Sequence, residues 1–326
     1  MATVEDSVLT VIRLLDNNMK LAKADGNIGS VYVSEEWYNR TVMKNHDAQV
    51  TVGLANSTHR KLGFSATLRL DVGLLRVILW VINKSGSEES PRAIRDKMRK
   101  EIKRIIAEKR TKPNITEYSF WNLGTTSKTH KAYEVAADAE LAPDNENWDE
   151  IEGEGYNKIW VSDDDRHSIS ADENLDYGLI LFRFKVGAES NVLTNLEFAF
   201  EGYGTAPGGN GATIKVWNFS SSSWENAQSG TAGTDETLTI ALSSGFSDLI
   251  DSNGYVYLLA RTTNPSNGST DAVLHCDFVK CAATVQGIHY VDVVSFGDSD
   301  DVEVNPVIWR TDFVLKTWLF ENIPVT

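Results

Sequence analysis

The side chains that most often perform catalysis or bind metals are sparse and scattered in this 326-residue chain. No two of its six histidines have the spacing of metal ligands; they are His46, His59, His130, His167, His275 and His289. Cys276 and Cys281 lie five residues apart in one expected strand, so they point to opposite faces and should stay reduced. The chain lacks G-x-S-x-G, H-E-x-x-H and C-x-x-C motifs and a phosphate-binding loop. We therefore expect no catalytic residue, no cofactor and no enzymatic activity.

An acidic segment at residues 162–176, SDDDRHSISADENLD, could offer oxygen ligands to Ca²⁺. Asp163, Asp165 and Asp172 are the candidate ligands. The spacing differs from an EF-hand loop, because the required glycine and the terminal glutamate are missing. A solvated acidic loop is therefore favoured over a metal site.

Two tryptophans, Trp217 and Trp224, could form a flat platform for stacking on a sugar. Strand alternation in the sequence IKVWNF places Trp217 and Phe219 on the face opposite Ile214 and Val216. One of these faces must line the core, and burial is the usual fate of aromatic side chains. A glycan platform and a core position both remain open.

Residues 84–112 form the one basic stretch of the chain, with 11 bases and 5 acids. Ser90-Pro91 is a typical helix start, and the isoleucines between residues 94 and 106 recur on one face of a helix. Arg92, Arg95, Arg99 and Lys103 lie off that apolar face. They could contact nucleic acid or an acidic neighbouring subunit, or they could simply be solvated.

Charge and composition divide the chain into parts. Residues 136–285 carry 24 acids and 7 bases, whereas the remainder carries 22 acids and 24 bases. Residues 136–155 are acidic and aperiodic and are interpreted as a linker. Residues 156–285 alternate short strand-like runs with Gly, Ser and Asn turns, which predicts an all-β sandwich of jelly-roll or immunoglobulin-like type.

The flanking segments contain helical patterns at residues 3–23 and 91–110 and several strand candidates, including an apolar run at 77–82. They predict an α+β outer domain, with an antiparallel sheet and two helices, at residues 1–135 and 286–326. The sandwich would interrupt this domain, because the last forty residues alone would form only a marginally stable hairpin. No apolar run is long enough to span a membrane, and no secretory signal begins the chain.

The order of these outer elements, with RVILWVIN before the basic helix and NPVIWRTDFVLKTWLFENI at the end, resembles a family of virion proteins. This family is that of the tail terminator, tail-completion or head–tail connector proteins of long-tailed phages and archaeal tailed viruses. The middle region is similar to a β-sandwich of viral and archaeal surface proteins, through stretches such as WNFSSSSWE and IDSNGYVYLLA.

The resemblance implies a structural virion protein that assembles in the host cytoplasm. Its partners would be copies of itself in a ring, expected to be a hexamer, together with tail tube and neck proteins. DNA would pass the ring without sequence-specific contacts, and the sandwich would project outward, where it could meet a glycan. The alternative is a cell-surface or carbohydrate-binding protein whose sandwich carries the function. No membrane association is expected.

Overall fold

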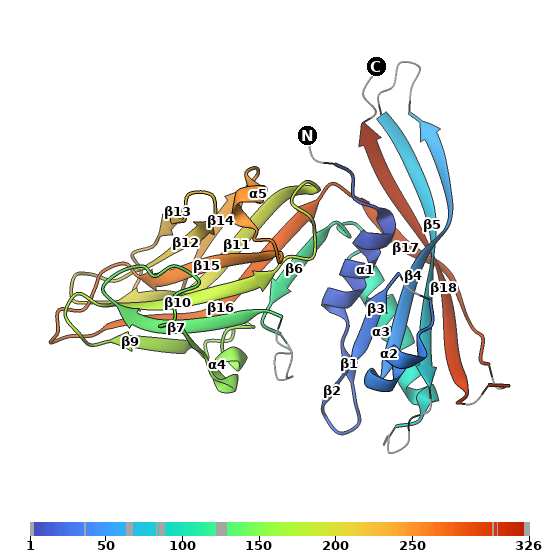
Figure 1. Cartoon of the computed structure of the whole chain (residues 1–326), viewed down its shortest axis with the longest axis horizontal. Coiled ribbons are helices and arrows are strands. Elements are labelled where there is room, and N and C mark those ends of the chain that lie inside the picture. The colour runs from blue at the N-terminus through green and yellow to red at the C-terminus, as the bar shows by residue number, and fades with distance from the viewer. Residues whose placement is uncertain are drawn as a thin grey trace. The chain divides into compact units, whose positions relative to one another are not determined.

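The computed structural model of the chain describes residues 3–35, 37–62, 68–82, 84, 89–121, 129–301, 303–304 and 306–322. The chain divides into two compact units, shown in Figure 1. One comprises Met1–Thr116 with Val285–Thr326, and the other comprises Glu117–Thr284. Within the described residues, no helix is both long and apolar enough to cross a membrane.

A five-stranded sheet in the order β17-β18-β5-β4-β3 forms the centre of the first unit. Its strands are β3 (Val31–Ser34), β4 (Ala48–Lys61), β5 (Leu68–Ile82), β17 (Tyr290–Asp298) and β18 (Ile308–Asn322). All neighbours are antiparallel except β3 and β4. The apolar run at 77–82 is buried on both faces of central β5, as its composition indicated. β17 lies at one edge of this sheet.

Helices α1 (Ser7–Asn18) and α3 (Pro91–Glu108) pack against this sheet. Ser90 caps α3 by accepting a hydrogen bond from the Ala93 amide at 3.2 Å, so the predicted helix start is confirmed. The apolar face of α3 is buried with α1 and the sheet in one core cluster. The smaller elements of this unit are β1 (Leu21–Ala22), β2 (Ile28–Gly29) and α2 (Arg40–Asn45).

The second unit contains two antiparallel sheets, as predicted for a mostly β, sandwich-like region. One has the order β13-β12-β15-β10-β7-β8, and the other has the order β14-β11-β16-β6 with β9 paired to β16. The strands of the first are β7 (Lys131–Ala137), β8 (Asp149–Glu150), β10 (Tyr177–Lys185), β12 (Ala212–Asn218), β13 (Ser223–Ser229) and β15 (Tyr255–Thr262). The strands of the second are β6 (Ile115–Ser119), β9 (His167–Ala171), β11 (Leu193–Thr205), β14 (Glu236–Leu242) and β16 (Ala272–Val285). Two short helices, α4 (Gly153–Asn157) and α5 (Phe246–Leu249), complete the unit.

Phenylalanines from both sheets meet in the sandwich core. Phe182 lies 6.3 Å from Phe200, and Phe184 lies 6.4 Å from Phe198, between ring centroids. These side chains come from alternate positions of β10 and β11, so each strand directs one of its faces inward. In YGLILFRFK, alternation is confined to the end, FRFK, whereas the preceding apolar run is buried on both faces of the strand.

The prediction that residues 136–155 form a linker is wrong, because this segment is part of the second unit. β7 extends to Ala137 and pairs with β10. Beyond it, the Glu140 carboxylate lies 2.7 Å from both the Lys215 ammonium and the Arg261 guanidinium. The Trp224 indole N–H donates to the Leu141 carbonyl at 3.0 Å. Acidic, aperiodic composition looked like a linker, but basic and indole partners on distant strands hold the segment in place.

The observed boundary between the units also differs from the predicted one. The sandwich begins near residue 117 rather than 156, because β7 belongs to its six-stranded sheet. The polar segment Ser223–Ser229 pairs with β12 at the sheet edge. Trp160 and Phe278 form a single isolated bridge.

Candidate functional site

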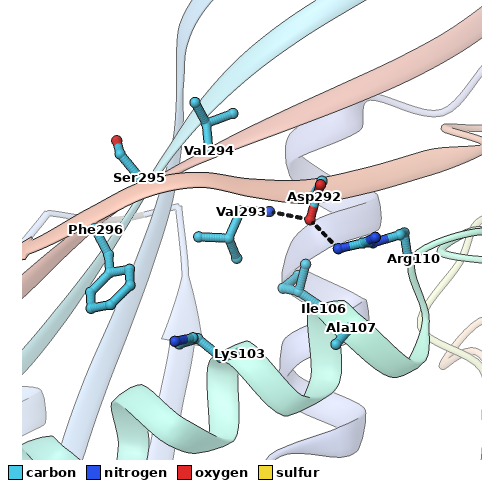
Figure 2. A pocket seen from close by; sticks show the side chains of 9 residues that line it. All are labelled: Lys103, Ile106, Ala107, Arg110, Asp292, Val293, Val294, Ser295 and Phe296. Atoms are coloured by element: carbon cyan, nitrogen blue, oxygen red, sulfur yellow. Dashed lines mark hydrogen bonds and ion pairs between the residues drawn. The ribbon is translucent and has the colours of Figure 1, made fainter.

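An open groove lies between α3 and the edge strand β17, as Figure 2 shows. Its volume is about 500 Å³. The helix contributes Lys103, Ile106 and Ala107, the turn after it contributes Arg110, and the strand contributes the segment 292–296. This is a concave surface with an apolar floor and charged side chains at its rim.

The strand beside the groove carries two exposed apolar side chains, Val294 at 59% and Phe296 at 45%. Phe296 points toward α3, whereas Val294 points away from the helix on the opposite side of the strand (Figure 2). A register shift between Val293 and Ser295 interrupts the pairing of β17 with β18 at this point. Edge strands of soluble proteins are usually blunted by charges or covered, because their free backbone groups can pair with another chain. The middle of β17 therefore has the features of a contact surface for another protein.

Ion pairs join the helix to the strand at both ends of the groove. At one end, Arg110 donates to the Asp292 carboxylate at 2.8 Å. At the other end, Arg99 lies 2.8 Å and Arg95 lies 3.2 Å from the Asp298 carboxylate. These bridges hold the groove open by keeping α3 and β17 at a defined separation.

The prediction that Arg95 projects to solvent is wrong. Arg95 is 4% exposed and also lies 2.5 Å from the Asp300 carboxylate, with its guanidinium 5.4 Å from the Trp309 ring centroid. A 3.6-residue period places Arg95 between Ile102 and Ile106, inside the apolar stripe, so the helical period itself indicates that this position is buried. Arg95 is therefore part of the internal packing of the first unit.

The carboxyl group of Asp298 is electrostatically tuned by these arginines. Burial alone would raise the pKa of Asp298, but the hydrogen bond from Thr311 and the positive charges of Arg95 and Arg99 hold it below its usual range. The Thr311 hydroxyl donates at 2.8 Å. Asp298 is therefore ionised at neutral pH and binds both arginines as a carboxylate.

The two remaining predicted bases have no acidic partner among the described residues. Arg92 and Lys103 are exposed, and within the described part of the chain no carboxylate forms an ion pair with either. The Lys103 ammonium lies 4.6 Å from the Phe296 ring centroid, across the groove. Of the four predicted bases, two are engaged with aspartates of the same unit and two are available to a partner.

The two tryptophans predicted as a glycan platform pack against each other instead. Their ring centroids are 5.0 Å apart with the rings at 68°, an edge-to-face arrangement. Trp217 is 9% exposed, and the Trp224 indole N–H already donates to Leu141. The pair is therefore part of the packing of β12 and β13, with Trp224 held at its ring edge by Leu141.

The three candidate calcium ligands are not brought together as a set. Asp163 and Asp165 precede β9, whereas Asp172 follows it, and a five-residue strand separates the two ends by about 16 Å. Asp165 instead pairs with Lys158 at 3.1 Å. A solvated acidic loop, the favoured interpretation, describes these residues better than a metal site.

A different trio of carboxylates, from Asp164, Asp235 and Asp277, does converge within 4.8 Å. Arg166 already binds two of them, since its guanidinium contacts Asp164 at 2.7 Å and also reaches Asp235. Burial raises the pKa of Asp277, against the hydrogen bonds from the Asp163 and Asp164 amides. This cluster is thus an internal ion-pair network around Arg166.

Sequence reasoning missed Val294 and Phe296. They belong to the run IHYVDVVSF, whose alternation predicts a strand but does not indicate whether it lies in the centre or at the edge. Two apolar residues in such a strand are buried by default. The only available signal was the aspartate-rich stretch GDSDD that follows, which is typical of an exposed strand end.

Comparison with known proteins concerns the second unit. Residues 127–285 match a family model, AF_1625_C, described as "Uncharacterized protein, C-terminal domain". This match spans slightly less than half of the chain and ends with β16. No protein with a curated description matches the chain.

Among solved structures, a xylan-binding module, CBM15, is 11% identical, with 53% of this chain and 97% of that chain covered and a TM-score of 0.28. A family 11 carbohydrate-binding module from Clostridium thermocellum, in complex with a beta-1,3-1,4-mixed-linked tetrasaccharide, is 10% identical. This match covers 52% of the present chain and 88% of the module, with a TM-score of 0.21. At TM-scores this low, the ligands of those modules remain properties of those modules alone.

Proposed function

We propose that this chain is a structural assembly protein whose first unit joins other protein chains through the groove between α3 and β17. The observation that supports this most directly is the pair of exposed apolar side chains, Val294 and Phe296, on a free edge strand beside that groove. Exposed apolar patches rimmed by charge are typical of protein–protein contacts. The resemblance to tail terminators suggests the setting: a ring at the head–tail junction of a virion.

The same proposal covers the relation between the two units along the chain. We infer that the first unit is an α+β domain and that the sandwich is inserted into it. The segments that enter and leave the sandwich are hydrogen-bonded to each other, because the Val285 amide donates to the Asn114 carbonyl at 3.0 Å. The chain therefore leaves and re-enters the first unit at adjacent points, which is what an insertion requires.

DNA contact by α3 has no support from the geometry. Arg95 pairs with Asp298 and Asp300, and Arg99 pairs with Asp298. Carboxylates therefore lie directly beside these two bases. A phosphate backbone approaching this surface would meet carboxylates as well as bases. A protein partner, which can offer both charges and apolar side chains, fits the groove better.

The test is the oligomeric state of the full-length chain with Val294→Asp and Phe296→Asp together. We expect the wild-type protein to form closed oligomers, visible by negative-stain electron microscopy and mass photometry, and the double variant to be monomeric. Val294 is 59% exposed, whereas Phe296 is 45% exposed and stacks on the buried Phe313 at 5.7 Å between ring centroids. Circular dichroism and thermal melting of the double variant therefore establish that it is folded before its oligomeric state is compared. Val304→Asp, at a residue 38% exposed outside the groove, is the matched control.

A wild-type chain that stays monomeric both alone and with its tail tube protein would refute the proposed function. Oligomers that persist in the double variant would show that assembly uses another surface.

A further inference from the structure

Resting on the proposed assembly function, we propose that the occupant of the groove is an acidic strip on the sandwich of a second copy of this chain. The strip is defined as residues 144–154 and carries Asp144, Glu146, Asp149, Glu150, Glu152 and Glu154. The contact would be head-to-tail, with the groove of one copy meeting the strip of the next.

The groove side of the contact is basic. Positions 92, 99 and 103 recur at intervals of seven and four residues, so they share one side of α3. Lys100 lies one turn before Lys103 and is exposed. Within the described residues, no carboxylate pairs with Arg92, Lys100 or Lys103. Of these three cations, Lys103 lines the groove 4.6 Å from the Phe296 ring centroid, and Arg92 lies near the start of the helix.

The strip is the densest acidic surface of the second unit. It contains six carboxylates and no lysine or arginine, and all six residues are exposed. In the described part of the chain, Glu150 is the one member with an ion pair, to Lys131 at 2.7 Å. The segment is also held in place, since the Trp148 indole N–H donates to the Ala142 carbonyl at 2.9 Å. A fixed array of carboxylates is a suitable counterpart for exposed cations that have no acidic partner of their own.

Like charges disfavour a symmetric contact through the groove. If β17 paired with β17 of another copy around Ser295, Asp292 of each strand would lie opposite Asp298 of the other. Acids directly opposite each other on antiparallel strands are destabilising. The groove therefore favours a different surface of its partner, and heterologous contacts of this kind generate rings when the rotation closes.

Charge reversal in the full-length chain tests this contact. Lys100→Glu with Lys103→Glu reverses the groove, and Asp144→Lys with Glu146→Lys and Glu152→Lys reverses the strip. We expect each set alone to weaken self-association about tenfold or more, measured by sedimentation velocity, and the two sets combined to restore it. Asp172→Lys with Glu173→Lys, an exposed acidic pair outside the strip, is the matched control and should have no effect.

A second measurement separates contacts between copies from contacts within one chain. An equal mixture of ¹⁴N- and ¹⁵N-labelled protein is treated with a carbodiimide, which joins a lysine ammonium to a carboxylate as an amide. We expect mixed-isotope cross-links between Lys103 and strip residues. Cross-links within single chains only would overturn the proposal.

The outcomes distinguish this inference from the proposed function. If oligomers form but neither reversal weakens them, or the combined reversal does not restore them, the strip is not the occupant and the assembly function stands. If the wild-type chain does not self-associate at all, even at about 50 mM salt where charge attraction is least screened, both this inference and ring formation by the chain alone are refuted.

Discussion

Replacing Arg95 distinguishes a structural arginine from a surface one on the same helix. Arg95→Met keeps an unbranched apolar stem of similar length to that of arginine but removes the guanidinium group and its charge. Asp298 and Asp300 would then lose the guanidinium that lies 3.2 Å and 2.5 Å away. Arg92→Met, one turn earlier and exposed, is the matched control.

The expected cost follows from the burial of the three partners. Removing one member of a buried ion pair typically destabilises a protein by about 3–5 kcal/mol. Here the carboxylates are 33% and 27% exposed, so water can partly replace the arginine, and Asp298 keeps Arg99 at 2.8 Å. We therefore expect Arg95→Met to lower the free energy of unfolding of the first unit by about 2–3 kcal/mol. Arg92→Met should change it by less than about 0.5 kcal/mol.

Differential scanning calorimetry at neutral pH measures both variants. For a unit of this size, about 2–3 kcal/mol corresponds to a loss of roughly 4–12 °C in the melting temperature of the first unit. Because the pKa of Asp298 is lowered in the folded state, its contribution is present above the unfolded pKa near 4 and is lost as pH falls through the lower folded value. The difference in melting temperature between Arg95→Met and the wild-type protein should therefore become smaller in strong acid. A melting temperature for Arg95→Met within about 1 °C of wild type at neutral pH would refute this account of α3.

Two further predictions concern the second unit and its attachment. Burial, with the charge of Arg183 as a lesser cause, lowers the pKa of His130 to about 4, and its Nδ1 accepts the Lys185 amide at 3.0 Å. The unfolded chain binds this proton near pH 6.5, so stability should fall by about 2–3 kcal/mol from pH 6.5 to 4. In urea titrations at a series of pH values, His130→Gln should reduce this loss of stability between pH 6.5 and 4. An unchanged dependence of stability on pH would show that His130 is not its cause. Separately, replacing Glu117–Thr284 by a short Gly/Ser linker should leave a folded first unit by circular dichroism; an unfolded product would exclude the interrupted-domain proposal.

Local patterns in the sequence determined which segments form regular structure. The Ser90-Pro91 start and the isoleucine period of α3, the apolar run of β5 and the alternation in β10 each correspond to an observed element. These signals are local because capping, helical period and strand alternation depend on residues a few positions apart. The polar edge strands β9 and β13 carried no such signal, since strands outside the core need no apolar face.

The tertiary structure alone decided which side chains are available to a partner. The helical period places Arg95 within the apolar stripe of α3, but only the fold brings Asp298 and Asp300 beside it, 203 and 205 residues later in the chain. Likewise, Glu140 is ordinary in sequence until β12 and β15 place Lys215 and Arg261 beside it. Exposure and ion pairing depend on contacts between residues far apart in the sequence. The position of β17 at a sheet edge is set in the same way, because strand order is a property of the whole sheet.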